Sequence, residues 1–210
     1  QGPCGVIGVI CIRPDCMLQF MVSMAVAIIC AFAATMMLGK TIGKKEASVS
    51  EKPVRTIETE PGCVYAPVQG TAVLHTEIKD ETFASGAVGT GVGIIPEKGE
   101  VVAPFSGEIS MVFDTKHAIG LLSEDGVELL IHVGVDTVDM GGTGFDIKVK
   151  EGDGVKAGQL LMTFDRKAIA DAGHPDVAVV IVLNPDDYTS IERTAEGTVA
   201  SGTKIIQASK

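Results

Sequence analysis

The sequence predicts an all-β fold, an antiparallel β-sandwich or barrel, preceded by one transmembrane helix. From residue 61 onward, short apolar runs alternate with Gly, Pro and Asp, the pattern of a protein built from many short strands. The chain of 210 residues contains 25 glycines and only 4% aromatic residues, as expected where turns are frequent. Near the N-terminus, a stretch without charged residues is long enough to cross a bilayer.

The uncharged stretch lies between Asp15 and Lys40 and contains 24 residues. Because about 20 apolar residues span a bilayer as a helix, we predict a transmembrane helix over about 16–39. Three lysines follow the stretch by position 45, so the positive-inside rule places the chain after residue 40 in the cytoplasm. A cleaved signal peptide is the alternative, because "AFA" resembles a cleavage site. The run is too long for one, and its basic residues lie on the wrong side.

Residues 41–60 combine mixed charge, Ser, Thr and Pro without an apolar period, which predicts a flexible linker before a domain at 61–210. After position 40 the chain carries 15 basic and 26 acidic residues, a net charge of −11. This balance argues against nucleic-acid binding and favours a partner with a basic face. Of the five cysteines only Cys63 lies in this part, which predicts a reducing compartment and no disulfide framework.

The apolar runs define the predicted strands, each bounded by turn residues. In chain order they cover residues 64–75, 91–96, 100–114, 118–122, 127–135, 146–150, 159–165, 177–183 and 202–207. Helix is expected only as a fragment, "RKAIADAG", at 166–173. Tyr65–Leu74 and Val102–Val112 share Ala-Pro-x-x-Gly, and Glu151–Leu161 is a glycine-rich turn. Biotinyl and lipoyl carrier domains and a family of zinc endopeptidases use the same pattern, so it indicates a fold and not a chemistry.

Two histidines flank a predicted hairpin. If the turn "SEDG" pairs Ser123 with Gly126, His117 lies directly opposite His132, with Cβ atoms about 5 Å apart. A two-residue turn at Asp125 and the following glycine would make the histidines diagonal neighbours instead. Both registers leave the two rings on the same face, because a slip of two residues preserves the side. The spacing therefore predicts a site made of facing imidazoles.

A neutral imidazole is a good nucleophile near pH 7, and its phosphoramidate passes a phosphoryl group onward. The second ring can donate a hydrogen bond to the phosphoryl oxygens, while Gly134 keeps the approach to His132 open. A zinc site is the other interpretation, but the endopeptidase pattern needs His-x-His, which glycine interrupts here. Lys116 is a weaker candidate for a carrier lysine, because its flanks lack the expected hairpin. His75 and His174 are expected to be a surface strand residue and a loop residue.

The run "VVAPFSGEISMVFDTKHAIGLLSEDGVELLIHVGVDTV", with its "KHAIGL" and "LLIHVGVDTV" motifs, resembles the glucose-family IIA domain of the bacterial phosphoenolpyruvate-dependent sugar phosphotransferase system, over roughly residues 61 to 208. The resemblance implies a jelly-roll-like topology, the duplicated hybrid motif. It implies that His132 is phosphorylated, that His117 stabilises the phosphate, and that Thr115 joins their hydrogen-bond network. The phosphoryl group would come from the carrier HPr and pass to a cysteine of a IIB domain, energising sugar uptake.

The same resemblance implies a docking surface for partners. Phe83, Val88 and Phe113 would supply its apolar part, and Asp80 and Asp136 would meet basic residues of HPr. No cofactor is implied, although the two facing histidines could bind an adventitious or partner-shared zinc ion.

Residues 1–40 resemble the end of the sugar-translocating IIC domain of sucrose, β-glucoside and trehalose permeases. In that arrangement the order is IIB, IIC, IIA, so IIB would lie upstream and the IIA domain would lie on the cytoplasmic side of the cell membrane. The sugar would be handled by IIC, and the sequence leaves its identity open. Two alternatives also remain open: a zinc-dependent peptidase or metal-binding module of related fold, and a regulatory protein that docks through the same face.

Overall fold

Antiparallel strands make up nearly all of the regular structure. The computed structural model describes residues 57–74, 78 and 90–210. The strands are β1 (Cys63–Tyr65), β2 (Gly70–Leu74), β3 (Thr90–Pro96), β4 (Glu100–Val102), β5 (Gly107–Val112), β6 (Ala118–Ser123), β7 (Glu128–Val133), β8 (Phe145–Ile147), β9 (Gly154–Val155), β10 (Leu160–Phe164), β11 (Ala178–Val182), β12 (Ser190–Arg193), β13 (Gly197–Val199) and β14 (Lys204–Ser209). The helical pieces are α3 (Arg166–Asp171), η4 (Thr137–Met140) and η5 (Pro185–Asp187).

This architecture confirms the all-β prediction. Within the described ranges, no helix is both long and apolar enough to cross a bilayer. The predicted span at 16–39, with most of the predicted linker, lies outside the described residues.

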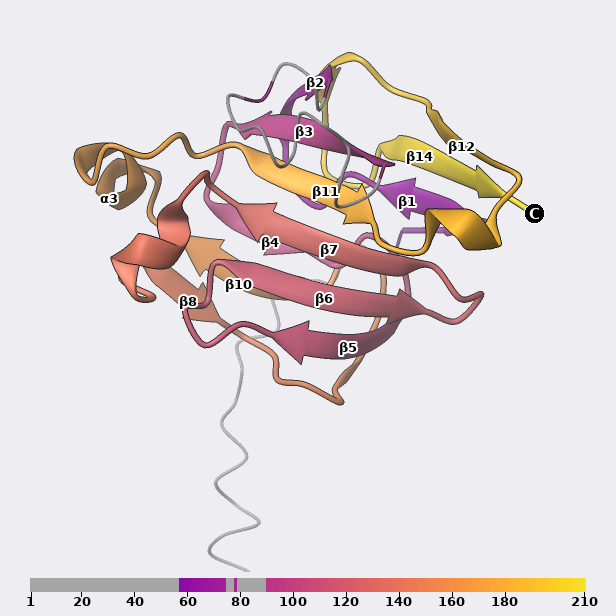
Figure 1. The fold of residues 1–210 in the computed structure, drawn as a ribbon, viewed down its shortest axis with the longest axis horizontal. Helices are drawn as coiled ribbons and strands as arrows, with labels where there is room; N and C mark the ends of the chain where they lie inside the picture. Colours follow the sequence, from indigo (N-terminus) through magenta and orange to yellow (C-terminus); the bar gives the residue numbers. More distant parts are fainter. Residues whose placement is uncertain (1–56, 75–77, 79–89) are drawn as a thin grey trace, which may run out of the picture. The chain divides into compact units, whose positions relative to one another are not determined.

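The strands form three sheets, and every pair of neighbours is antiparallel. The largest has the order β13-β2-β3-β11-β7-β6-β5-β9, and the smaller ones are β1-β14-β12 and β4-β10-β8 (Figure 1). One hydrophobic core joins all three, with Ile131 from the large sheet, Leu161 from β10 and Ile206 from β14 among its buried members. The sheets therefore pack face to face around one core, as in a sandwich.

The two Ala-Pro-x-x-Gly segments contact one another with reciprocal hydrogen bonds. The backbone N–H of Tyr65 donates to the carbonyl of Pro104 at 3.3 Å, and that of Val102 donates to the carbonyl of Pro67 at 2.9 Å. Tyr65 and Val102 occupy equivalent places in the repeat, as do the two prolines. The internal similarity thus corresponds to two segments that pair with each other in the same way from both sides.

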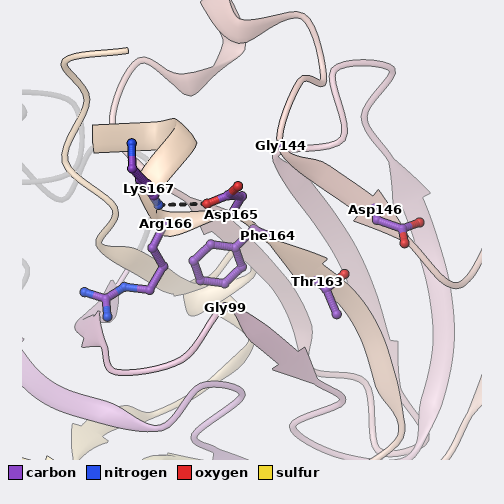
Figure 2. A pocket seen from close by; sticks show the side chains of 8 residues that line it. All are labelled: Gly99, Gly144, Asp146, Thr163, Phe164, Asp165, Arg166 and Lys167. Atoms are coloured by element: carbon purple, nitrogen blue, oxygen red, sulfur yellow. Dashed lines mark hydrogen bonds between the residues drawn. The ribbon is translucent and has the colours of Figure 1, made fainter. Parts of the chain in front are cut away.

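The predicted helical fragment forms as α3. Asp165 is its N-cap, because the carboxylate accepts hydrogen bonds from the backbone N–H groups of Lys167 and Ala168. Figure 2 shows the first of these bonds at a shallow hollow between α3 and the strands β8 and β10. The charged side chains in this hollow have partners of their own, such as Asp176 for Arg166. Neither His117 nor His132 lines it.

The chain enters the described unit at the β6–β7 hairpin. Ile57 lies over Gly202, where an added Cβ would come within 3.0 Å of the isoleucine Cδ1, and it lines an open hollow together with Glu124 of the hairpin. The backbone N–H of Gly62 donates to the carboxylate of Asp125 in the same hairpin. The last residues before Pro61, which the sequence places in the linker, thus already contact the β domain.

Candidate functional site

His132 lies near the end of β7, in the middle of the large sheet. Its Cα partners are Ala118 on β6 and Val179 on β11. Side chains along β7 are alternately buried and more exposed, and His132 belongs to the more exposed set. The histidine is therefore half-buried on the outer face, while Ile131 and Val133 point into the core.

Neither predicted register of the hairpin is correct. Ala118 pairs with His132, one residue away from each expected pairing. The cause is a three-residue loop: the N–H of Ser123 donates to the carbonyl of Val127, and Gly126 adopts the left-handed conformation with φ of 95°. This three-residue turn, with a left-handed residue at its end, is a common hairpin connection and differs from both connections expected from the sequence.

The two rings nevertheless meet, because His117 lies just outside the regular strand. In a continuous strand the observed register would put His117 on the face opposite to His132. Strand β6 begins only at Ala118, and the residue before the histidine, Lys116, has a left-handed backbone with φ of 59°. The predicted proximity is thus real, but the reason given for it was wrong.

The imidazoles of His117 and His132 are in edge-to-face contact. Their ring centroids are 4.6 Å apart, with an interplanar angle of 77°. Phe113 packs on His117 from another side, with a centroid distance of 5.5 Å. His117 is only 4% exposed, so its ring is enclosed, whereas the ring of His132 is more accessible. The two histidines are therefore not equivalent.

Thr115 fixes the orientation of the buried ring. Its hydroxyl Oγ1 lies 2.7 Å from Nδ1 of His117. Burial lowers the pKa of His117 below its usual value of 6.5, an effect that a hydrogen bond from the ring to the backbone carbonyl of Thr115 partly opposes. The ring is accordingly neutral near pH 7. When the hydroxyl donates to Nδ1, the proton of the neutral ring resides on Nε2.

Glycine is required at position 134 for a structural reason, which differs from the predicted role of keeping the approach to His132 open. Its φ is 82°, and an added Cβ would come within 2.2 Å of Cγ2 of Thr137. Thr137 is fully buried and donates its hydroxyl hydrogen to the carbonyl of Val133 at 2.6 Å. The glycine lets the chain turn sharply after His132 and allows Thr137 to close the turn.

The remaining predicted site residues fall into two groups. Phe113 is half-buried beside His117, and Asp136 is exposed at the start of η4, with φ of 57°. The described residues do not include Asp80, Phe83, Val88 or His75. His174 lies half-buried in the loop between α3 and β11, as expected of a loop residue.

An apolar row on the outer face was not predicted from the sequence. Met111 pairs with Gly120, and Gly120 pairs with Leu130, two residues from His132 on the same strand. Met111 is 43% exposed, and Leu130 is half-buried. The alternation along β7, which puts Leu130 and His132 on the same face, is a usable signal in the sequence, but the contribution of Met111 depends on a register shift between Ile109 and Met111.

No group of three or more His, Cys, Asp or Glu side chains that could hold a metal ion occurs among the residues that the structure describes. Two imidazoles in contact, one of them hydrogen-bonded to a hydroxyl, can carry a phosphoryl group on a ring nitrogen.

The antiparallel β fold and the histidine pair together assign the chain to the class of phosphocarrier domains. Comparison with known proteins gives the family. The model described as "phosphoenolpyruvate-dependent sugar phosphotransferase system, EIIA 1" matches residues 63–188, and the chain belongs to this family. It is thus a phosphotransferase component of the sugar phosphotransferase system.

Curated relatives and a solved structure agree. The chain is 44% identical over 172 residues to the glucose-specific EIICBA component of Staphylococcus carnosus, which covers 80% of the chain and 25% of the relative. It is 36% identical over 186 residues to the β-glucoside-specific EIIBCA component of Dickeya chrysanthemi, which covers 84% of the chain and 30% of the relative. The glucose permease IIA of Mycoplasma capricolum matches 70% of this chain and 96% of its own, with 32% identity and a TM-score of 0.64. The chain therefore spans less than a third of the length of these two curated relatives.

Proposed function

We propose that His132 is the residue that carries the phosphoryl group. The contact between the rings of His117 and His132, 4.6 Å apart, is the observation that supports this most directly. Of the two rings, His132 is the more exposed and lies on the outer face of the sheet, where a donor protein can reach it. His117 is almost fully enclosed and is less suited to direct attack on a protein-bound phosphate.

In the proposed reaction, a ring nitrogen of His132 attacks the phosphorus atom of phosphorylated HPr. The new P–N bond forms as the P–N bond to the HPr histidine breaks, and the imidazole of HPr leaves. In the second step a cysteine thiolate of a IIB domain attacks the same phosphorus atom, and the bond to His132 breaks. Each step exchanges one bond to phosphorus for another, so no oxidant or further cofactor is required.

His117 is proposed to stabilise the phosphoryl group. When the hydroxyl of Thr115 donates to Nδ1, the Nε2–H group is the donor available to a phosphoryl oxygen. A donor that is already oriented costs no reorganisation when negative charge accumulates on those oxygens. Thr115 would thus be a positioning residue that acts through His117.

The outer face beside His132 is the proposed docking surface. Met111, Leu130 and Phe113 would provide its apolar contacts, and Asp136 would meet a basic partner. We extend this proposal to Phe83, Val88 and Asp80 on the basis of the family resemblance alone. HPr and the IIB domain would use this surface in turn, since both must reach the same ring.

For the whole protein we propose a IIA domain from about residue 61 to 210, a linker before it, and the end of a IIC membrane domain at residues 1–40. The EIICBA and EIIBCA names of the relatives support IIB and IIC as partners. The IIA domain would then act on the cytoplasmic side of a membrane permease, with a jelly-roll-like topology.

The test of this function is incubation of the chain with phosphoenolpyruvate, enzyme I and HPr, followed by mapping of the acid-labile phosphate. We expect one phosphoryl group on His132. Phosphate on His117 in the unaltered protein would contradict the assignment of roles, and no HPr-dependent phosphorylation would contradict the proposed donor.

A further inference from the structure

Two residues of the site have an unusual backbone. Among the described residues, Lys116 and Asp136 are the only non-glycines with positive φ, 59° and 57° respectively. Lys116 immediately precedes His117, and Asp136 follows His132 by four positions. Aspartate adopts the left-handed conformation comparatively readily, whereas for lysine the contact of Cβ with the backbone makes it unfavourable.

The turns at the two ends of strand β6 have the same hydrogen-bond pattern, and the one after the strand has glycine at the left-handed position. There the N–H of Gly126 donates to the carbonyl of Ser123, and Gly126 is left-handed. In the turn before β6, the N–H of Lys116 donates in the same way to the carbonyl of Phe113, at 2.8 Å. Glycine would relieve the strain at position 116, as it does at 126. Strained residues cluster at functional sites, so the strain at Lys116 is a reason to seek a role for its side chain.

The side chain of Lys116 is exposed and extends along the loop at residues 134–142. An added Cβ at Gly142 would lie 3.5 Å from Cδ of the lysine, so the aliphatic stem crosses this glycine. Among the described residues, no carboxylate forms an ion pair with the ammonium group. The stem is therefore placed by packing, and the charge remains available.

The loops around the histidines are otherwise acidic. Residues 113–117 and 134–142 contain three exposed carboxylates, Asp114, Asp136 and Asp139, and Lys116 is their single lysine or arginine. A phosphoryl group on His132 would bring up to two further negative charges to this acidic surface. Repulsion from the carboxylates disfavours the phosphorylated state, and a cation between the two loops opposes that repulsion.

We propose that Lys116 sets the phosphorylation equilibrium of the site, because its ammonium group offsets the charge of the phosphoryl group on His132. This inference rests on the proposed function of His132. For an assumed separation of about 7 Å in water, a charge of +1 changes the equilibrium of a group of charge −2 by roughly sevenfold, and physiological salt reduces this to about two- to threefold.

The measurement is the equilibrium constant for phosphoryl exchange between HPr and the chain, at about 0.02 M and 1 M salt. An equilibrium constant depends only on the free and phosphorylated proteins, so a change in docking alone leaves it unaltered. Lys116→Gln removes the positive charge and keeps the backbone strain. Lys116→Arg keeps the charge and the strain, whereas Lys116→Gly removes the charge and the strain. Lys156→Gln, an exposed lysine beside the hairpin end of the domain, is the matched control for the loss of one positive charge.

We expect Lys116→Gln and Lys116→Gly to lower the constant about three- to sevenfold at low salt, and Lys116→Arg and Lys156→Gln to stay within twofold of the unaltered chain. The differences should disappear at 1 M salt. Lys116→Gly should also raise the melting temperature, because it relieves the backbone strain. A lower equilibrium constant in a more stable protein would show that the lost charge, and not a damaged fold, is the cause. Equal constants for the Gln, Gly and Arg variants would overturn the inference while phosphate still maps to His132; absence of phosphate from His132 would instead overturn the proposed function.

Discussion

The rings of His117 and His132 meet edge to face at 4.6 Å, although Ala118 and not His117 is paired with His132. The irregular backbone before β6 allows one histidine to be buried and the other to remain accessible. Unequal burial of two chemically identical side chains makes unequal roles testable.

Substitution by glutamine should separate these roles. His132→Gln should abolish phosphorylation, because the attacking nitrogen is absent. His117→Gln should still accept phosphate from HPr but transfer it to IIB much more slowly, because the oriented donor to the phosphoryl oxygens is lost. Radiolabel transfer from phosphoenolpyruvate, followed by a chase with IIB, measures both steps. Phosphorylation of the His132→Gln variant at full stoichiometry would disprove the assignment.

The lowered pKa of His117 predicts how stability depends on pH. Between that pKa and about 6.5, the unfolded chain binds more protons than the folded one, so the free energy of unfolding rises with pH. The contribution is complete above about pH 6.5 and is lost as the pH falls towards the folded pKa. Urea unfolding at pH 5.5 and 7.5 should show a smaller difference for His117→Gln than for the unaltered chain. An equal difference in both proteins would show that His117 does not titrate in this way.

Replacement of the Thr115 hydroxyl should affect transfer through His117. Thr115→Val removes the hydrogen bond to Nδ1 at nearly constant volume and should slow transfer to IIB about three- to tenfold, corresponding to roughly 0.5–1.5 kcal/mol. Thr115→Ser keeps the hydroxyl and should retain most of the rate. Loss of a hydroxyl that donates to Nδ1 makes the ring of His117 easier to protonate. The pH dependence of the transfer rate should therefore shift to higher pH in the valine variant. Equal rates for the Val and Ser variants would exclude the positioning role.

Gly134 is predicted to be intolerant of a side chain. Gly134→Ala combines an unfavourable left-handed backbone with an overlap against Cγ2 of Thr137, together about 2–4 kcal/mol of lost stability. Adding Thr137→Ser removes the overlapping methyl group while it keeps the hydroxyl bond to Val133, and should recover part of the loss. Urea unfolding followed by tyrosine fluorescence gives both values. No recovery in the double variant would mean that the backbone conformation alone causes the cost.

Charge at the docking surface should govern the rate of the encounter with HPr. Asp136→Asn retains a residue that tolerates the left-handed backbone but removes the carboxylate, and should slow phosphorylation about two- to fivefold at low salt. The difference should vanish at high salt. Glu124→Gln, at the opposite end of the strand pair, is the matched control. If both variants lose the same rate, net charge and not Asp136 is responsible.

The strands with strong alternation or continuous apolar runs could be predicted from the sequence, as could the N-capped helix at Arg166. β12 (Ser190–Arg193) and β13 (Gly197–Val199) are absent from the predicted strands, because few of their side chains reach the core and each lies at a sheet edge. Such strands depend on backbone pairing with a neighbour, which local sequence does not reveal.

The residues of the candidate site could be predicted from the sequence better than their geometry could. The spacing of His117 and His132 around a turn indicates proximity, but the register depends on whether Gly126 ends a two-residue or a three-residue loop. Likewise, the glycine after His132 suggested open access, whereas its nearest constraint is a methyl group of Thr137. Contacts between residues distant along a strand or across a turn decide both points.

The anchoring of Ile57 and Gly62 near the β6–β7 hairpin places the start of the domain at one end of this strand pair and the histidines at the other. With a rise of about 3.3 Å per residue, the separation is roughly 20 Å. Over this length, a rotation of about 30° at the attachment would move the ring of His132 through roughly 10 Å. If the ring of His132 meets two protein partners in turn, as proposed, a small rotation at the root of the domain is sufficient to turn it from one towards the other without any change within the fold.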